Sequence, residues 1–251
     1  MSITGPPWND KFKAIAKEMK TMQELTSQAM QRLSAAQPQS EGFEIKLRCT
    51  GCGRERESKS RVPRPGLYAY ECGDCAFVRR ERRFRNLCPL LYQNSDETRL
   101  PAAQLKQAMD WSYGHMGILL TGDTGTGKTR VAWLMLRRIL VQSARDYTFE
   151  WFDAIGFGHE ISRHYRDEDA EDWFEKLASS DLVFFDDLGK LKLTERAETE
   201  LFGLIERRCA ARLPIVATTN DTGDTLGSRL TDNRGPALIR RLREFCNVIR
   251  F

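Results

Sequence analysis

The segment Gly122–Thr129 constrains the fold of this chain more than any other part of its sequence. It reads Gly-Asp-Thr-Gly-Thr-Gly-Lys-Thr, follows the short apolar run Ile118–Leu120 and precedes a helical pattern over Arg130–Gln142. A loop of this composition between a strand and a helix turns its backbone N–H groups inward around phosphate oxygens. The sequence therefore predicts a phosphate-binding loop at one edge of an α/β sheet.

Two side chains of this loop have distinct expected tasks. Lys128 is expected to reach the β- and γ-phosphates of a nucleoside triphosphate, and the Thr129 hydroxyl is expected to ligate Mg²⁺. The rest of the loop is expected to hold the phosphates through its backbone. These residues are Gly122, Asp123, Thr124, Gly125, Thr126 and Gly127.

A second motif has the form of an apolar strand that ends in paired carboxylates. Leu182–Phe185 is followed directly by Asp186 and Asp187. This order predicts that Asp186 lies at the carboxyl end of a strand, close to the Mg²⁺ ion. Asp187 is then placed to orient or activate the water that attacks the γ-phosphate.

A third strand is predicted at Pro214–Thr219, and it ends at Asn220. If this strand lies beside the first one in the sheet, Asn220 faces the γ-phosphate and the attacking water. A single asparagine in a turn is common, so the two preceding motifs are what give this residue a functional interpretation.

Together, the three motifs resemble those of an AAA+ ATPase, with Ala217–Asn220 as sensor 1. The segments Leu201–Arg208 and Leu238–Arg243 are similar to blocks of the DnaC/DnaI-type helicase loaders and their IstB-like relatives. The resemblance implies an α/β, ASCE-type P-loop core with a parallel sheet. It also implies ATP and Mg²⁺ as ligands and slow ATP hydrolysis that depends on an oligomer, on DNA or on a partner.

Two features depart from the pattern of that family. The second carboxylate of the strand motif is Asp187, where AAA+ proteins usually have glutamate, and this predicts slow turnover. The sequence ends at Phe251, and no helical lid is therefore expected. By resemblance, Arg241 is the candidate arginine finger that acts on a neighbouring protomer, with Arg240 and Arg243 as alternatives.

Four of the seven cysteines form two pairs, Cys49-x-x-Cys52 and Cys72-x-x-Cys75. This spacing predicts one tetrahedral Zn²⁺ site of structural type, because four thiolates leave no position open for water. A redox role is disfavoured because there are two pairs and neither is predicted to open a helix. The pattern resembles a zinc ribbon, with a turn expected at Pro63–Gly66.

The chain is therefore expected to have three parts: an amphipathic helix and linker at 1–42, a four-cysteine zinc ribbon with a basic tail at 43–86, and the ATPase domain at 87–251. The helix at 11–33 either packs on its own protein or docks on a partner through its methionine-containing stripe. The sequence leaves both interpretations open.

The net charge of +4 conceals an uneven distribution, because residues 46–85 hold 12 basic and 5 acidic residues. Arginines with interleaved phenylalanines are typical of proteins that bind single-stranded nucleic acid. Arg79, Arg80, Arg82 and Arg83 are accordingly the candidate DNA contacts, with a solvated basic surface as the alternative. The ribbon is expected to bind either DNA or protein.

By resemblance, the expected function is ATP-dependent loading of a hexameric replicative DNA helicase onto single-stranded DNA, with self-association through the ATPase domain. One alternative is an IstB-like helper ATPase of a transposase. Another is a nucleotide-gated DNA-binding adaptor with little turnover, an interpretation that Asp187 keeps open. The sequence shows no signal peptide and no apolar run long enough to span a bilayer, so a cytoplasmic protein without membrane contact is expected.

Overall fold

The computed structural model describes residues 43–60, 67–190, 194–228 and 234–251. These residues fall into two compact units, divided between Glu71 and Cys72. The predicted N-terminal helix and linker at 1–42 and the predicted turn at Pro63–Gly66 lie outside the described residues. Within the described ranges, no helix is long and apolar enough to cross a membrane.

The first unit contains a small sheet with the order β2-β1-β3. Strand β1 (Phe43–Cys49) pairs antiparallel with β2 (Glu55–Ser60) and parallel with β3 (Leu67–Tyr70). The turn between β1 and β2 is closed by backbone bonds from Gly53 to Cys49 at 2.9 Å and from Cys49 to Arg54 at 2.8 Å. Gly53 has a φ of +72°, in the left-handed region where a side chain is disfavoured. This local geometry holds Cys49 and Cys52 in one tight turn.

The second unit is built on a five-stranded parallel sheet with the order β5-β6-β7-β4-β8. The strand that precedes the phosphate-binding loop is β4, and it lies between β7 and β8. All five strands therefore present their carboxyl ends at one edge of the sheet. The strands are β4 (Gly117–Thr121), β5 (Phe149–Asp153), β6 (Leu182–Asp186), β7 (Ile215–Thr219) and β8 (Cys246–Arg250).

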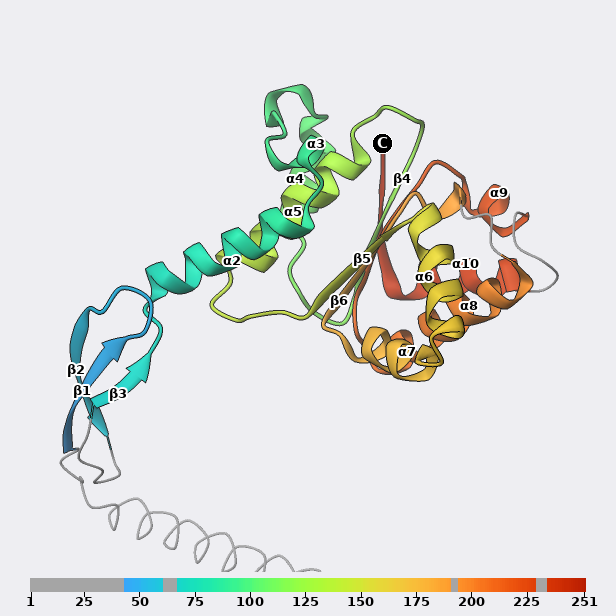
Figure 1. Cartoon of the computed structure of the whole chain (residues 1–251). Helices are drawn as coiled ribbons and strands as arrows, with labels where there is room; N and C mark the ends of the chain where they lie inside the picture. Colours follow the sequence, from blue (N-terminus) through green and yellow to red (C-terminus); the bar gives the residue numbers. More distant parts are fainter. Residues whose placement is uncertain (1–42, 61–66, 191–193, 229–233) are drawn as a thin grey trace, which may run out of the picture. The chain divides into compact units, whose positions relative to one another are not determined.

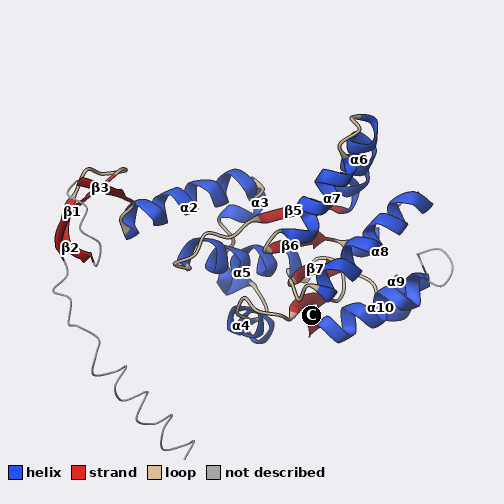
Figure 2. Cartoon of the chain, turned by 90° about the horizontal axis from the view of Figure 1, so that it is seen from below, coloured by secondary structure: helices blue, strands red, loops and turns tan. Residues whose placement is uncertain are grey.

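Helices cover both faces of this sheet, as Figures 1 and 2 show. On one face, α5 packs against α2, α3 and α4; on the other, α8 packs against α7 and α10. The helices are α2 (Gly73–Leu87), α3 (Leu90–Gln93), α4 (Ala102–Asp110), α5 (Lys128–Gln142), α6 (Ala154–Arg166), α7 (Ala170–Ser179), α8 (Glu195–Ala210), α9 (Gly223–Ser228) and α10 (Arg234–Phe245), with short 3₁₀ turns η1 (Glu97–Arg99) and η2 (Leu188–Lys190).

The central strands are apolar throughout because each face of the sheet has its own core. Along β6, Val183 and Phe185 pack with α6, α7 and α8, whereas Leu182 and Phe184 pack with α5. Side chains alternate between the two faces of a strand, so a strand that is buried on both sides shows no polar alternation. The predicted α/β class with a parallel sheet is confirmed.

The basic segment Arg79–Arg85 lies on helix α2. The expectation that neither cysteine pair opens a helix is wrong: Cys72 is the N-cap of α2, and Cys75 lies in its first turn. The predicted boundary at residue 86 falls inside this helix. Phe84 of α2 is buried and meets Trp133 of α5 edge-on at 5.9 Å. The arginines therefore belong to a helix that packs within the second unit.

Arg208 is a fully buried guanidinium within the second unit. Its nitrogens donate to the backbone oxygens of Leu177 at 2.6 Å, Ser180 at 2.8 Å and Pro214 at 2.8 Å. Burial lowers the pKa of Arg208 to about 10. The side chain thereby ties the end of α7 to the segments that lead into β6 and β7.

Candidate active site

The predicted phosphate-binding loop runs from the end of β4 to the start of α5. Gly125 and Gly127 have φ values of +83° and +97°, which side chains rarely adopt. Gly127 is also the N-cap of α5, so the N-terminal N–H groups of that helix open toward the loop. This arrangement of backbone donors at a helix N-terminus is suited to bind an anion.

Lys128 is the first residue of α5, and only 6% of its surface is exposed. Its Nζ donates to the carbonyl oxygens of Gly122 at 2.8 Å and Asp123 at 2.7 Å. A buried ammonium group needs such partners, because burying an unpaired charge is costly. The ammonium is thus held at the loop, where it can exchange these carbonyls for phosphate oxygens.

The two aspartates at the end of β6 meet residues from the loop and from β7. The Thr129 hydroxyl donates to Oδ1 of Asp186 at 2.7 Å. Nδ2 of Asn220 donates to Oδ1 of Asp187 at 3.1 Å. The parallel pairing of β4 with β7 places Thr121 beside Thr219. The strands of the first and third motifs are therefore neighbours in the sheet, as expected.

Burial raises the pKa of Asp186, and the neighbouring carboxylates of Asp187 and Asp153 raise it further. Hydrogen bonds from Thr218 and Thr129 act in the opposite direction, because they stabilise the ionised form. A cluster of carboxylates with this much burial is a favourable environment for a divalent cation.

Residues from all three motifs share one pocket of about 320 Å³, although Gly122, Asp123 and Thr126 of the loop do not line it. It is lined by Leu91, Tyr92, Thr124, Gly125, Gly127, Lys128, Thr129, Arg130, Asp186, Asp187, Thr218 and Asn220. A neighbouring pocket of about 330 Å³ lies on the other side of the loop, between Gly125–Gly127 and the segment Asn94–Leu100. Open space therefore lies on both sides of the loop. The carboxylates of Asp186 and Asp187 line only the first of the two pockets.

Three lining residues with polar groups, Tyr92, Arg130 and Thr218, are not among the individually predicted site residues, although Thr218 lies within the sensor 1 segment. Thr218 had a usable signal, because it stands two residues before Asn220 on a strand and so shares its face. No sequence pattern points to Tyr92 or Arg130. The Arg130 guanidinium lies 5.8 Å from the centre of the Tyr92 ring, and this contact joins α3 to the start of α5. Only the folded chain brings these two segments together.

Arg241, the candidate arginine finger, lies on α10 and does not line this pocket. Its guanidinium donates to Glu206 at 2.6 Å and to Glu244 at 3.2 Å. Arg240 and Arg243 are exposed on the same helix. Within this chain, Arg241 is therefore held by two carboxylates outside the pocket.

The four candidate DNA contacts lie along α2. Arg79 pairs with Asp146 at 2.7 Å, Arg80 donates to the carbonyl oxygen of Val141 at 3.0 Å, and Arg83 donates to that of Tyr147 at 3.1 Å. Arg82 is exposed and takes part in none of these contacts. Three of the four arginines thus also attach α2 to the end of α5 and to the segment between α5 and β5.

The paired cysteines form a cluster, as predicted. The sulfur atoms of Cys49, Cys52, Cys72 and Cys75 all lie within 4.8 Å of one another. Tetrahedral Zn²⁺ with bonds of about 2.3 Å places its sulfurs roughly 3.8 Å apart, so the four residues fit this ion. Nε of Arg54 donates to the Cys52 sulfur at 3.3 Å, the kind of contact that supports a thiolate ligand.

The other three cysteines are separate from this cluster. Cys88, Cys209 and Cys246 are buried in the second unit. Burial raises the pKa of their thiols to about 12, about 11 and about 12, respectively. Their thiols are therefore poor ligands and poor nucleophiles at neutral pH.

Solved structures with the same fold include DNA replication proteins. The crystal structure of the DnaC helicase loader matches with a TM-score of 0.52 and 18% identity, over 68% of this chain and 99% of that chain. DnaI matches with a TM-score of 0.52 and 16% identity, over 67% of this chain and 93% of that chain. AMPPCP-bound DnaA from Aquifex aeolicus matches with a TM-score of 0.50 and 18% identity, over 67% of this chain.

The match to this DnaA structure spans 49% of its length, so the chain corresponds to about half of that protein. No curated protein matches the sequence. A family profile described as IstB-like ATP binding protein matches residues 91–251, which include the loop and all five strands of the parallel sheet. The chain belongs to this family of IstB-like ATP binding proteins.

Proposed function

We propose that this protein is an ATPase that loads a replicative DNA helicase onto single-stranded DNA. The observation that carries the ATPase part is the convergence of Lys128, Thr129, Asp186, Asp187 and Asn220 on one pocket. The loader part is supported by the fold, which the chain shares with nearly the whole length of the DnaC helicase loader and of DnaI.

In this proposal, the loop and Lys128 bind the triphosphate of ATP. The backbone N–H groups of Gly122–Thr129 and the N-terminus of α5 supply donors, and Lys128 supplies a positive charge for the β- and γ-phosphates. Asp187 accepts a proton from the attacking water or orients it, and Asn220 holds the Asp187 carboxylate through the bond at 3.1 Å.

Thr129 and Asp186 would hold Mg²⁺, whose oxygen-ligand preference they fit. When bound, this ion would neutralise negative charge on the phosphates of ATP. The four-cysteine cluster would hold a structural Zn²⁺, which supplies folding free energy to a small unit with little apolar core.

We assign Arg241 to a neighbouring protomer's active site, because it does not line the pocket of its own chain. ATP-dependent self-association then brings Arg241 to the γ-phosphate bound by the next protomer, and hydrolysis requires the assembly. Its pairing with Glu206 and Glu244 holds the guanidinium in place before assembly.

Helix α2 and the four-cysteine cluster are the proposed contacts to DNA or to the helicase. Electrostatic binding to phosphates needs positive charges that remain accessible. Arg82 meets this condition, and Arg79, Arg80 and Arg83 offer only the part of their guanidinium groups that intrachain contacts leave uncovered.

A loading assay tests the proposal as a whole. The purified chain is mixed with the replicative helicase of its host, ATP and single-stranded DNA coated with single-strand binding protein. Unwinding of an annealed oligonucleotide is then measured. We expect unwinding to require the chain and to fail with Lys128→Ala. ATP hydrolysis without any helicase loading would remove the loader part and leave the ATPase part standing.

The family description favours a second candidate, an IstB-like helper ATPase of a transposase. The two candidates differ in the partner that they bind with ATP. Capture with the full chain from the native host, with ATP present and with Lys128→Ala as the control, recovers a hexameric helicase in the first case and a transposase in the second.

A further inference from the structure

The hydroxyl of Thr218 lies between the two consecutive carboxylate residues of the active site. Thr218 is on β7 and only 1% of its surface is exposed. Its Oγ1 is 2.7 Å from Oδ1 of Asp186 and 2.7 Å from the backbone nitrogen of Asp187. One hydroxyl group from β7 thus contacts both residues at the end of β6.

The direction of these two bonds is fixed by chemistry. The backbone N–H of Asp187 can only donate, so Oγ1 accepts from it. An ionised carboxylate can only accept, so the single proton of the Thr218 hydroxyl goes to Asp186. Oδ1 of Asp186 also accepts from Thr129. Both bonds at Oδ1 are therefore committed to threonines, and Oδ2 is left for other partners.

Asp187 stands in a backbone conformation that needs such support. Its φ is +60°, in the left-handed region, which is unfavourable for a residue other than glycine. The pairing of β6 with β7 ends at Phe185 and Ala217, so the N–H of Asp187 has left the sheet ladder. The Thr218 side chain takes the place of the missing backbone acceptor.

The turn that Thr218 stabilises aims the Asp187 side chain. With this backbone, Oδ1 of Asp187 lies 3.1 Å from Nδ2 of Asn220, on the same side as Asp186 and Thr129. A catalytic carboxylate displaced by about 1 Å can lose of the order of 100-fold in rate. The rate of hydrolysis should therefore depend strongly on the direction in which the Asp187 side chain leaves the backbone.

We propose that Thr218 is a positioning residue for ATP hydrolysis, which fixes Asp186 and Asp187 relative to each other through one hydroxyl group. This inference rests on the proposed ATPase function. It assigns Thr218 no contact with ATP. Its hydroxyl acts through Asp186 on metal binding and through Asp187 on the attacking water.

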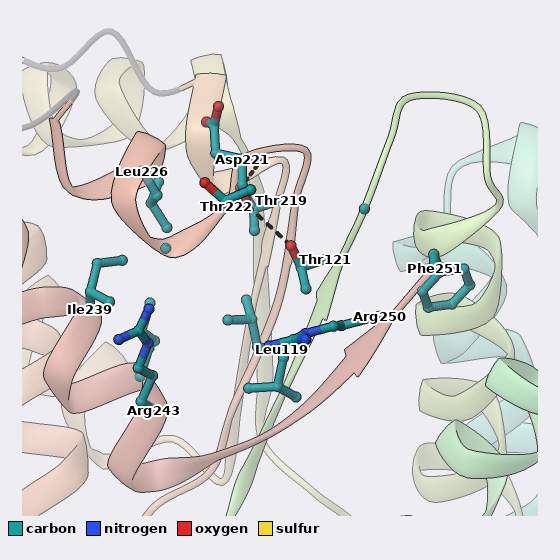
Figure 3. Close-up of a pocket in the computed structure, with 14 residues that line it drawn as sticks. Leu119, Thr121, Thr219, Asp221, Thr222, Leu226, Ile239, Arg243, Arg250 and Phe251 are labelled. Atoms are coloured by element: carbon teal, nitrogen blue, oxygen red, sulfur yellow. Dashed lines mark hydrogen bonds between the residues drawn. The ribbon is translucent and has the colours of Figure 1, made fainter.

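Thr219 supplies a matched control on the same strand. It is also 1% exposed, and its hydroxyl likewise accepts from a backbone N–H, that of Asp221, at 3.1 Å. Its side chain points to the other face of the sheet, into the pocket drawn in Figure 3 beside Thr121 and Asp221. Valine at either position removes one buried hydroxyl group. Only Thr218→Val also removes the hydrogen bonds to Asp186 and Asp187.

The experiment compares Thr218→Val, Thr218→Ser and Thr219→Val with the unaltered chain. We expect Thr218→Val to lower kcat roughly 10- to 100-fold, while KM for ATP stays within about threefold. It should also raise the Mg²⁺ concentration for half-maximal ATP binding. Thr218→Ser keeps the hydroxyl and should recover most of both losses. Thr219→Val removes no hydroxyl contact to Asp186 or Asp187 and should leave the Mg²⁺ titration as in the unaltered chain. Thermal unfolding verifies that all variants fold.

ATP binding, measured with a fluorescent ATP analogue over a Mg²⁺ titration, separates this inference from the proposed function. If the unaltered chain binds the analogue without turnover, the ATPase proposal is wrong and the Mg²⁺ titration alone decides the role of Thr218. Equal kcat and equal Mg²⁺ titrations for Thr218→Val and the unaltered chain would overturn the inference. Equal losses in Thr218→Val and Thr219→Val would overturn it too, and an unaltered chain that binds no ATP overturns both proposals.

Discussion

The hydroxyl of Thr129 donates a hydrogen bond of 2.7 Å to Asp186, a residue that follows it by 57 positions in the sequence. This contact joins the phosphate-binding loop after β4 to the carboxyl end of β6, although β7 lies between these two strands in the sheet. It brings the two proposed Mg²⁺ ligands into direct contact.

The proposed role of Arg241 predicts complementation between two inactive variants. Arg241→Ala has an intact loop and lacks the finger, whereas Lys128→Ala has an intact finger and lacks the loop lysine. Mixing them should restore ATP hydrolysis well above the sum of the separate rates, because some interfaces then combine an intact loop with an intact finger. Phosphate release from the mixture measures this.

Glu206→Gln is the control for the loss of the Arg241 ion pair, since it removes the partner and keeps the finger. A mixture no more active than its two components would assign Arg241 to a structural role. The same mixing experiment with Arg240→Ala or Arg243→Ala identifies the finger if it is one of those exposed neighbours.

The four-cysteine cluster predicts one Zn²⁺ per chain. Elemental analysis of the purified protein should find this stoichiometry, and Cys49→Ser or Cys72→Ser should lose it, because each removes one of four thiolate ligands. Cys246→Ala should keep the metal, since Cys246 is buried in the second unit and outside the cluster. Zinc content that does not depend on Cys49 or Cys72 would rule out this site.

Arg208 predicts a large effect on stability. Arg208→Met removes a buried guanidinium that donates to four backbone carbonyls and should lower the free energy of unfolding by about 2–4 kcal/mol. Arg207→Met, the exposed neighbour on α8, should change stability little. Urea denaturation followed by tryptophan fluorescence compares the two, and equal losses would show that the buried hydrogen bonds are not the cause.

Arg82 predicts a change in DNA binding without a change in folding. Arg82→Glu should weaken binding to single-stranded oligonucleotides and reduce the slope of log K against log salt by about 1 for each phosphate that is no longer neutralised. Arg80→Ala should lower the melting temperature as well, because it also detaches α2 from the Val141 carbonyl.

The exposed Arg166 on α6 is the control for the charge change at Arg82. If Arg82→Glu and Arg166→Glu weaken binding equally, the DNA contact is not on α2.

Much of the second unit could be predicted from the sequence, because its signals are local. Gly122–Thr129 and the apolar runs before Asp186 and Asn220 each specify a strand end by their own composition. The contacts of the basic segment could not be predicted, because Arg79, Arg80 and Arg83 meet the segment Val141–Tyr147 only in the folded chain.

The details of the site depend on interactions between distant segments. The start of helix α2 could not be predicted because cysteine is a poor N-cap and Cys72 gives no capping bond. Thr218 was visible as part of a motif, but its bond to the N–H of Asp187 follows from the left-handed backbone at that aspartate, which composition does not reveal.

ATP hydrolysis at this pocket is measured by steady-state phosphate release with Mg²⁺, with and without single-stranded DNA. We expect measurable turnover by the unaltered chain, a loss of about 100-fold or more in Lys128→Ala, and no loss in Lys106→Ala, an exposed lysine on α4. Turnover by Lys128→Ala at the rate of the unaltered chain would show that this pocket does not hydrolyse ATP.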